Sequence, residues 1–91
     1  MNEKITIGIG ELVNTLSGHD AGQFFLVVRT EPGYVWLCDG KTRKATKCKR
    51  KNRKHIVGTG IVCDWVEQHP EQVNNTAVRR AIKELSEEYG R

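Results

Sequence analysis

Long apolar runs are missing from this 91-residue chain. None of its apolar stretches approaches the roughly 18 residues that a membrane span needs. The first six residues also lack the apolar segment of a signal peptide. We therefore expect a soluble, cytoplasmic protein. Its length predicts one domain over residues 1–91, with a modest core and no deep pocket for a small-molecule substrate.

Cysteine is also scarce, with only Cys38, Cys48 and Cys63. An odd number of widely spaced cysteines is a poor disulfide framework and fits a reducing compartment. Together with His69 they form no close C-x-x-C pair, which zinc modules favour. The sequence therefore predicts no metal site and no cofactor.

Catalytic motifs are absent as well. Ser17, His19 and Asp20 are neighbours in sequence, and this alone does not align a nucleophile, a base and an orienting carboxylate. Gly8-x-Gly10 has no third glycine and is not a dinucleotide fingerprint. We therefore expect no enzyme activity and no catalytic residues.

Short apolar runs alternate with turn signals over the first two thirds of the chain. Residues 24–28 and 34–38 read as buried strands, and a further short strand is expected within 56–63. Ile5, Ile7 and Ile9 alternate with small residues, which predicts an N-terminal strand or extended lead-in. Turn signals occur at 17–22, 31–33 and 39–40. Strands about ten residues apart predict a mainly β fold, a small antiparallel barrel over about residues 5–63.

The C-terminal stretch is typical of an amphipathic helix over about residues 75–89. Val78, Ile82, Leu85 and Tyr89 form one apolar stripe, with Asn75 or Thr76 as the N-cap and Gly90 at the C-cap. We expect this helix to close the open side of the barrel, with partner binding as the alternative. Residues 64–68 predict a helical turn before the proline at position 70.

Charge is concentrated in residues 41–55. Nine of the 15 Lys and Arg residues lie there and no acidic residue does, so the segment carries +9 and the rest of the chain −5. Such a run repels itself, and a polyanion is the simplest partner for it because each neutralised phosphate releases counterions. A solvated, flexible loop is the alternative. The candidate RNA-binding residues of this basic arm are Lys41, Arg43, Lys44, Lys47, Lys49, Arg50, Lys51, Arg53, Lys54 and His55.

Several segments carry a family likeness. Residues 10–13 and 17–23, followed by Phe25 and Val27, resemble a KOW motif. Residues 39–43 (Asp-Gly-Lys-x-Arg), 51–55 and 75–81 resemble matching segments of short bacterial KOW-domain RNA-binding proteins, which are similar to the ribosomal protein L14e family. The likeness spans roughly residues 8–83. It departs from the usual pattern at Phe25, where many KOW motifs have a third glycine, and at Cys48, where the L14e-like family often has proline.

This resemblance implies an SH3-like, KOW-type β-barrel and RNA binding in translation, on ribosomal RNA or the ribosome. It also directs attention to the turn between Gly18 and Gly22. That turn either only shapes a hairpin or brings its backbone against an RNA phosphate or sugar, with His19 as a possible donor. We expect a monomer.

Two further questions stay open in the sequence. Tyr34 and Trp36 share one face of their strand and Val35 and Leu37 the other, so the aromatics either fill the core or stack on unpaired bases. The function could instead be that of a protein-interaction module that uses the barrel edge and acidic helix residues, or that of a DNA-binding protein. Trp65 is expected to pack between barrel and helix.

Overall fold

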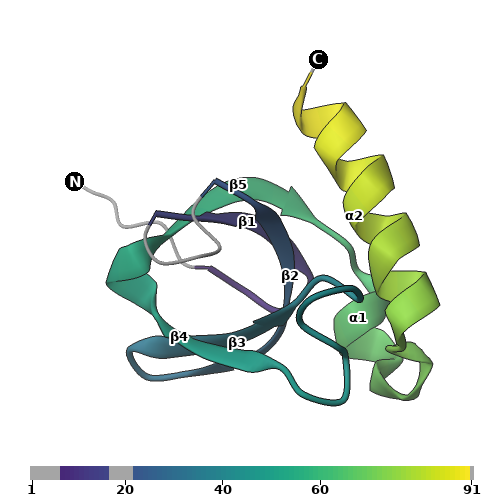
Figure 1. Ribbon diagram of the computed structural model, residues 1–91, viewed down its shortest axis with the longest axis horizontal. Helices are drawn as coiled ribbons and strands as arrows, with labels where there is room; N and C mark the ends of the chain where they lie inside the picture. Colours follow the sequence, from purple (N-terminus) through teal and green to yellow (C-terminus); the bar gives the residue numbers. More distant parts are fainter. Residues whose placement is uncertain (1–6, 17–21, 91) are drawn as a thin grey trace.

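The computed structural model describes residues 7–16 and 22–90 of the chain (Figure 1). A five-stranded antiparallel sheet is followed by two short helical segments and one long helix. The strands are β1 (Glu11–Thr15), β2 (Phe24–Glu31), β3 (Tyr34–Cys38), β4 (Lys49–Asn52) and β5 (Ile56–Val62). The helical segments are η1 (Arg53–His55), α1 (Trp65–Gln68), η2 (Pro70–Gln72) and α2 (Asn75–Tyr89).

The strand order is β4-β3-β2-β1-β5, and every neighbouring pair is antiparallel. The sheet curls around its inner face, with β1 and β5 on one side and β3 and β4 on the other (Figure 1). The register shifts once in β1–β5 and once in β2–β3, and irregularities of this kind, such as bulges, bend strands. The mainly β class and the C-terminal helix are confirmed. Within the described residues no pairing joins β4 to β5, so the expected closure of the barrel is not found.

Alternation along β2 and β3 builds the core inside the curl. Phe25 and Val27 from β2 meet Val35 and Leu37 from β3, all fully buried, and Ile56 of β5 joins them. Burial of each large apolar side chain contributes about 1.5–3 kcal/mol. The alternation also decides the open question on β3, because Tyr34 and Trp36 lie on the opposite face and are half-buried.

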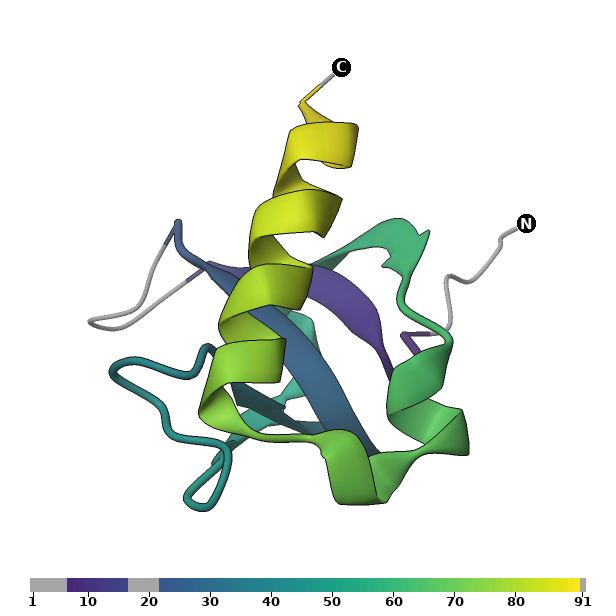
Figure 2. The ribbon, with the colours of Figure 1, turned by 90° about the vertical axis from the view of Figure 1, so that its right-hand side faces the viewer.

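A second core lies between the outer face of the sheet and α2, which crosses in front of β2 in Figure 2. Leu26 and Cys38 from the sheet pack there against Val66 of α1 and against Val78 and Ala81 of α2. The predicted helix therefore covers one side of the sheet. Its apolar side chains become more exposed toward the C-terminus of the helix.

The ends of α2 refine the prediction. Tyr89 is 52% exposed and touches the Phe24 ring edge-on at 5.9 Å between centroids. The N-cap is Asn74, whose side chain accepts a hydrogen bond from the Ala77 amide at 2.9 Å, not the predicted Asn75 or Thr76. Gly90 is the C-cap, as expected.

Of the two predicted forms of the N-terminal segment, a strand or an extended lead-in, the strand is not found in the described residues. β1 begins at Glu11, after the alternating isoleucines, and Ile5 lies outside the described residues. Gly10 has φ +88°, and a side chain there would clash with the Cys63 carbonyl oxygen. This turn directs Ile7 into the core without strand pairing.

Glu11 lies in that turn and is only 3% exposed. It accepts hydrogen bonds from the amides of Gly8 and Gly60, each at 3.1 Å. The Glu11 side chain therefore ties the N-terminal segment to β5. None of the helices among the described residues is long and apolar enough to cross a membrane.

Candidate nucleic-acid interface

The basic segment is divided among three kinds of structure and is not one loose arm. Residues 41–48 form a loop, Lys49–Asn52 form the edge strand β4, and Arg53–His55 form η1. Trp36 pairs with Arg50 and Leu37 with Lys49 across β3–β4. A strand of charged residues forms here because long aliphatic stems can cover apolar surface while their charged ends reach water. Charged side chains on an edge strand also hinder pairing with other chains.

Asp39 organises the start of the basic loop. Its carboxylate accepts hydrogen bonds from the amides of Lys41 (2.9 Å) and Arg43 (2.8 Å) and from the Thr42 hydroxyl (2.9 Å). Partial burial raises the pKa of Asp39, but these hydrogen bonds outweigh it and leave the pKa below its usual value. The Arg43 carbonyl in turn accepts the amides of Asp39 and Gly40, both at 3.0 Å. The loop therefore has a defined conformation at its first turn.

The start of α2 holds the same loop from the other side. Asn75 accepts the Ala45 amide on its side-chain oxygen at 2.8 Å, and Arg79 donates to the Gly40 carbonyl at 2.7 Å. Gly40 has φ +77°, and a Cβ atom there would lie 2.5 Å from the Asn75 carbonyl oxygen. Figure 2 shows the loop running beside the first turns of α2. The lysines of the loop are thus presented on an anchored backbone.

Exposure separates the cations into two groups. Lys41, Lys44, Lys47 and Lys54 are exposed, and their ammonium groups make no ion pair within the described residues; we call these four the exposed lysines. His55 is exposed as well. Arg50 is exposed too but is paired with Glu31, whereas Arg43, Lys49, Lys51 and Arg53 are half-buried. Arg43 and Lys51 are engaged in interactions inside the protein.

Arg50 and Arg53 have intramolecular partners. The Arg53 guanidinium donates to the Ile7 carbonyl at 3.1 Å, so it fastens the N-terminal segment to the sheet. Arg50 donates twice to one oxygen of Glu31, at 3.1 and 3.0 Å, and its guanidinium carbon lies 3.7 Å from the centroid of the Tyr34 ring. Both guanidinium groups are therefore already engaged within the protein.

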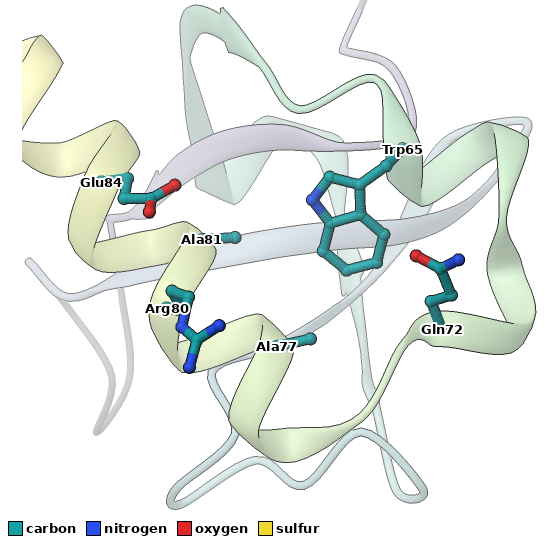
Figure 3. A pocket seen from close by; sticks show the side chains of 6 residues that line it. All are labelled: Trp65, Gln72, Ala77, Arg80, Ala81 and Glu84. Atoms are coloured by element: carbon teal, nitrogen blue, oxygen red, sulfur yellow. The ribbon is translucent and has the colours of Figure 1, made fainter.

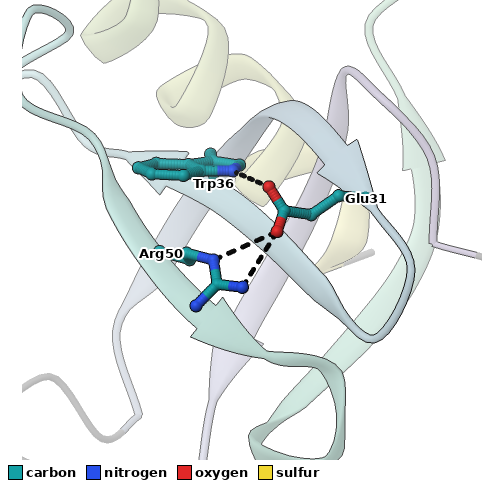
Figure 4. Close-up of polar contacts among 3 residues, drawn as sticks. All are labelled: Glu31, Trp36 and Arg50. Carbon is teal, nitrogen blue, oxygen red and sulfur yellow. Dashed lines mark hydrogen bonds and ion pairs between the residues drawn. The ribbon is translucent and has the colours of Figure 1, made fainter.

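Glu31 joins Arg50 to the aromatic face of β3 (Figure 4). Its second oxygen accepts the Trp36 indole N–H at 2.8 Å. That hydrogen bond, followed by those from Arg50, lowers the pKa of the Glu31 carboxyl below its usual value. Arg29 lies on the same face, 5.6 Å from the centroid of Trp36. The outer face thus carries ordered aromatic rings with cations beside them.

The expected glycine turn falls largely outside the described residues, which leave out Gly18 and His19. Gly22 is described: it has φ +82°, is exposed, and donates its amide to the Thr15 carbonyl at 2.8 Å. Gly22 and Lys41 line the same groove of about 520 Å³, which also touches Arg79 on α2. The structure therefore brings one residue of the turn close to the basic loop, although they are far apart in sequence.

Trp65 lies where the sequence placed it, between the sheet and α2. It is half-buried against the second core and lines a groove of about 340 Å³ with Arg80 and Glu84 of α2 (Figure 3). Charges of both signs meet at this groove, so it offers no field of one sign to a polyanion.

Metal-binding potential is low in the described part of the chain, where no group of three His, Cys, Asp or Glu side chains could hold an ion. Cys38 and Cys48 lie next to each other, since they follow on from the Leu37–Lys49 pair of the β3–β4 ladder. Burial raises the pKa of the Cys38 thiol to about 12, so it stays protonated and unreactive near neutral pH.

Sequence reasoning missed the residues that order the site. Glu31 belongs to a turn signal, and nothing in the sequence shows that it faces Trp36 and Arg50. Asn75 was read as a helix cap, whereas its side chain holds the loop. Only the register of the strands and the docking of α2 reveal these roles.

Comparisons with known proteins assign no family. The chain matches no protein-family model and has no significant match among curated proteins.

Proposed function

We propose that this protein binds RNA in the translation machinery, with ribosomal RNA as the target, and that its curled sheet is an SH3-like barrel of the KOW type. The observation that carries the proposal is the set of exposed lysines, three of them on a loop that Asp39 and α2 hold in place. Lysine binds phosphate as a point charge without reading sequence, so this surface supplies affinity. The likeness to L14e-like proteins supports RNA over other polyanions.

The antiparallel order of the five strands supports the proposed barrel type. The edges β4 and β5 are joined by only the short η1, so the sheet nearly returns on itself. Such binding needs no enzyme activity, cofactor or second subunit, and suits a cytoplasmic protein.

A charge-matched pair of variants tests the RNA surface. Lys44→Gln/Lys47→Gln removes two charges from the basic loop, and Arg80→Gln/Lys83→Gln removes two from α2. At 0.1 M salt, loss of two phosphate contacts lowers affinity roughly 25- to 60-fold, because each contact contributes about 0.7–0.9 to the salt exponent. The α2 variant is expected to bind structured ribosomal RNA like the original protein. Equal losses in both variants would reduce the proposal to a general charge effect, and unchanged binding in both would reject it.

A protein-interaction function is the second candidate. The observation in its favour is β5, an edge strand on which Val57 and Val62 are 45% and 47% exposed. An exposed strand edge can pair with a strand of a partner. Nuclease treatment of proteins captured with this chain distinguishes the two: partners held through RNA are released, and partners held at the strand edge stay bound.

A further inference from the structure

A groove opens on the outer face of the sheet beside Trp36. Its volume is about 420 Å³, within the range of ligand-binding pockets. It is lined by Arg29 and Trp36 of the sheet, by Thr46 and Cys48 of the loop formed by residues 41–48, and by Pro70 and Val73, which precede α2. No carboxylate lines this groove among the described residues. It therefore combines an apolar, aromatic wall with the Arg29 guanidinium, while the nearby Glu31 carboxylate lies outside the lining and is held by Trp36 and Arg50.

Trp36 offers a rigid surface in this groove. Its indole N–H is fixed by Glu31 at 2.8 Å, so the ring is already oriented before a ligand arrives. The ring is half-buried and lies on the same face of β3 as Cys38, which packs against α2. A planar ligand could stack on the accessible part of the ring without first ordering it.

One cation lies beside this planar surface, and two more lie on the loop next to the groove. The Arg29 guanidinium lies 5.6 Å from the centroid of the Trp36 ring, and Arg29 is exposed. Lys44 and Lys47 flank the loop residues that form one wall, and both are exposed. A ligand that fits must therefore join a flat apolar group to negative charge within a few ångströms. A nucleotide with an unpaired base has this combination, whereas an apolar peptide segment lacks the charge.

The groove lined by Trp65 can be compared with the groove beside Trp36. Trp65 faces both Arg80 and Glu84, and its groove is smaller, about 340 Å³ (Figure 3). Glu84 lines that groove directly, whereas the carboxylate near Trp36, that of Glu31, is engaged by Trp36 and Arg50 and does not line its groove. The two grooves thus offer an internal comparison between one tryptophan suited to a nucleotide and one that is not.

We propose that the groove beside Trp36 takes one unpaired RNA base, which stacks on the indole while Arg29 and the exposed lysines of the basic loop hold the adjoining phosphates. This inference rests on the proposed RNA-binding function. It adds a preference for unpaired bases, which the lysines cannot provide because they bind phosphate and not bases. Bases inside a duplex are stacked on each other, so only a bulge, loop or single strand presents a free base to Trp36. The protein therefore selects RNA that contains an unpaired base over fully paired RNA.

Two matched RNA hairpins test this preference, one fully paired and the other carrying a single unpaired uridine. The original protein is expected to bind the bulged hairpin more tightly. Trp36→Leu should weaken that binding by about 5- to 150-fold, the range for one stacked base, and leave binding of the paired hairpin unchanged. Trp36→Phe keeps an aromatic ring and should restore most of the preference. Trp65→Leu is the matched control and should not alter it.

Fluorescence gives a second readout that does not depend on how well Trp36→Leu folds. In the Trp65→Phe protein Trp36 is the remaining indole, and stacking of a base on it should quench its emission with the bulged hairpin more than with the paired one. Equal affinities for the two hairpins and equal quenching would overturn the base site while leaving salt-dependent RNA binding intact. If neither hairpin binds, the proposed function itself fails.

Discussion

Replacement of Asp39 by alanine tests whether the basic loop is held in one conformation. The change removes the acceptor of three hydrogen bonds, from the amides of Lys41 and Arg43 and from the Thr42 hydroxyl. Hydrogen bonds to a buried charge contribute about 1.5–3 kcal/mol each, but Asp39 is partly solvated, and about 0.5–1 kcal/mol each is the appropriate scale. We therefore expect Asp39→Ala to lower the free energy of unfolding by about 1.5–3 kcal/mol.

Urea denaturation at pH 7 measures this loss directly. Asp64→Ala is the control, because Asp64 is exposed and its side chain makes no capping hydrogen bond; its effect should stay within about 0.5 kcal/mol. Hydrogen exchange should also show that the amides of Lys41 and Arg43 lose protection in Asp39→Ala. If the two alanine variants are equally stable, the reasoning about the loop is refuted.

The pH dependence of the same variant gives an independent check. Because the folded-state pKa of Asp39 is lowered, its contribution is present above the unfolded pKa near 4 and is lost as pH falls through the folded value. The difference in stability between the original protein and Asp39→Ala should therefore shrink below pH 4. A difference that stays constant down to pH 2 would contradict the assigned hydrogen bonds.

Three further predictions concern other parts of the fold. Gly40→Ala should lower the free energy of unfolding by about 1–3 kcal/mol in a urea titration, because it combines a positive φ with a clash against the Asn75 carbonyl. Gly33→Ala is the control and should lower it less, because Gly33 has φ +80° but no neighbouring atom that a Cβ would meet. Glu11→Ala leaves the amides of Gly8 and Gly60 without their acceptor, which should lower the free energy of unfolding by about 2–5 kcal/mol. The loss should appear as a lower denaturation midpoint, and an unchanged midpoint would mean that water replaces the Glu11 side chain freely. The Cys38 thiol has a folded-state pKa of about 12, so above pH 9 it loses its proton in the unfolded chain but keeps it in the folded protein. The free energy of unfolding therefore falls by up to about 1.4 kcal/mol per pH unit in that range. Cys38→Ala should show a shallower fall in stability between pH 8 and 10.

The apolar elements could be predicted from sequence because local pattern determines them. β3 occupies the predicted residues 34–38, and α2 occupies the predicted residues 75–89, although Tyr89 of the predicted stripe is exposed. The strand predicted as one alternative for the N-terminal isoleucines does not form, because a glycine turn that sequence alone does not reveal precedes β1. β4 escaped notice because its residues are charged and it forms by pairing with β3.

The charge of the site could be predicted, but its organisation could not. The sequence shows that nine cations lie in this segment. Strand register and helix docking determine that Arg50 binds the Glu31 carboxylate and lies over the Tyr34 ring, and that Arg53 donates to the Ile7 carbonyl. These are contacts between residues 16 to 46 positions apart, and local pattern carries no information about them. The structure therefore shifts the expected phosphate contacts from the arginines to the exposed lysines.

The salt dependence of RNA binding tests the central claim most directly. Four phosphate contacts by the exposed lysines predict a slope of about −2.8 to −3.6 for log affinity against log salt concentration, at about 0.7–0.9 per contact. Replacement of Lys41, Lys44, Lys47 and Lys54 by glutamine should make the slope shallower by that amount while the denaturation midpoint stays unchanged. A folded quadruple variant that keeps both the affinity and the slope of the original protein would contradict the account.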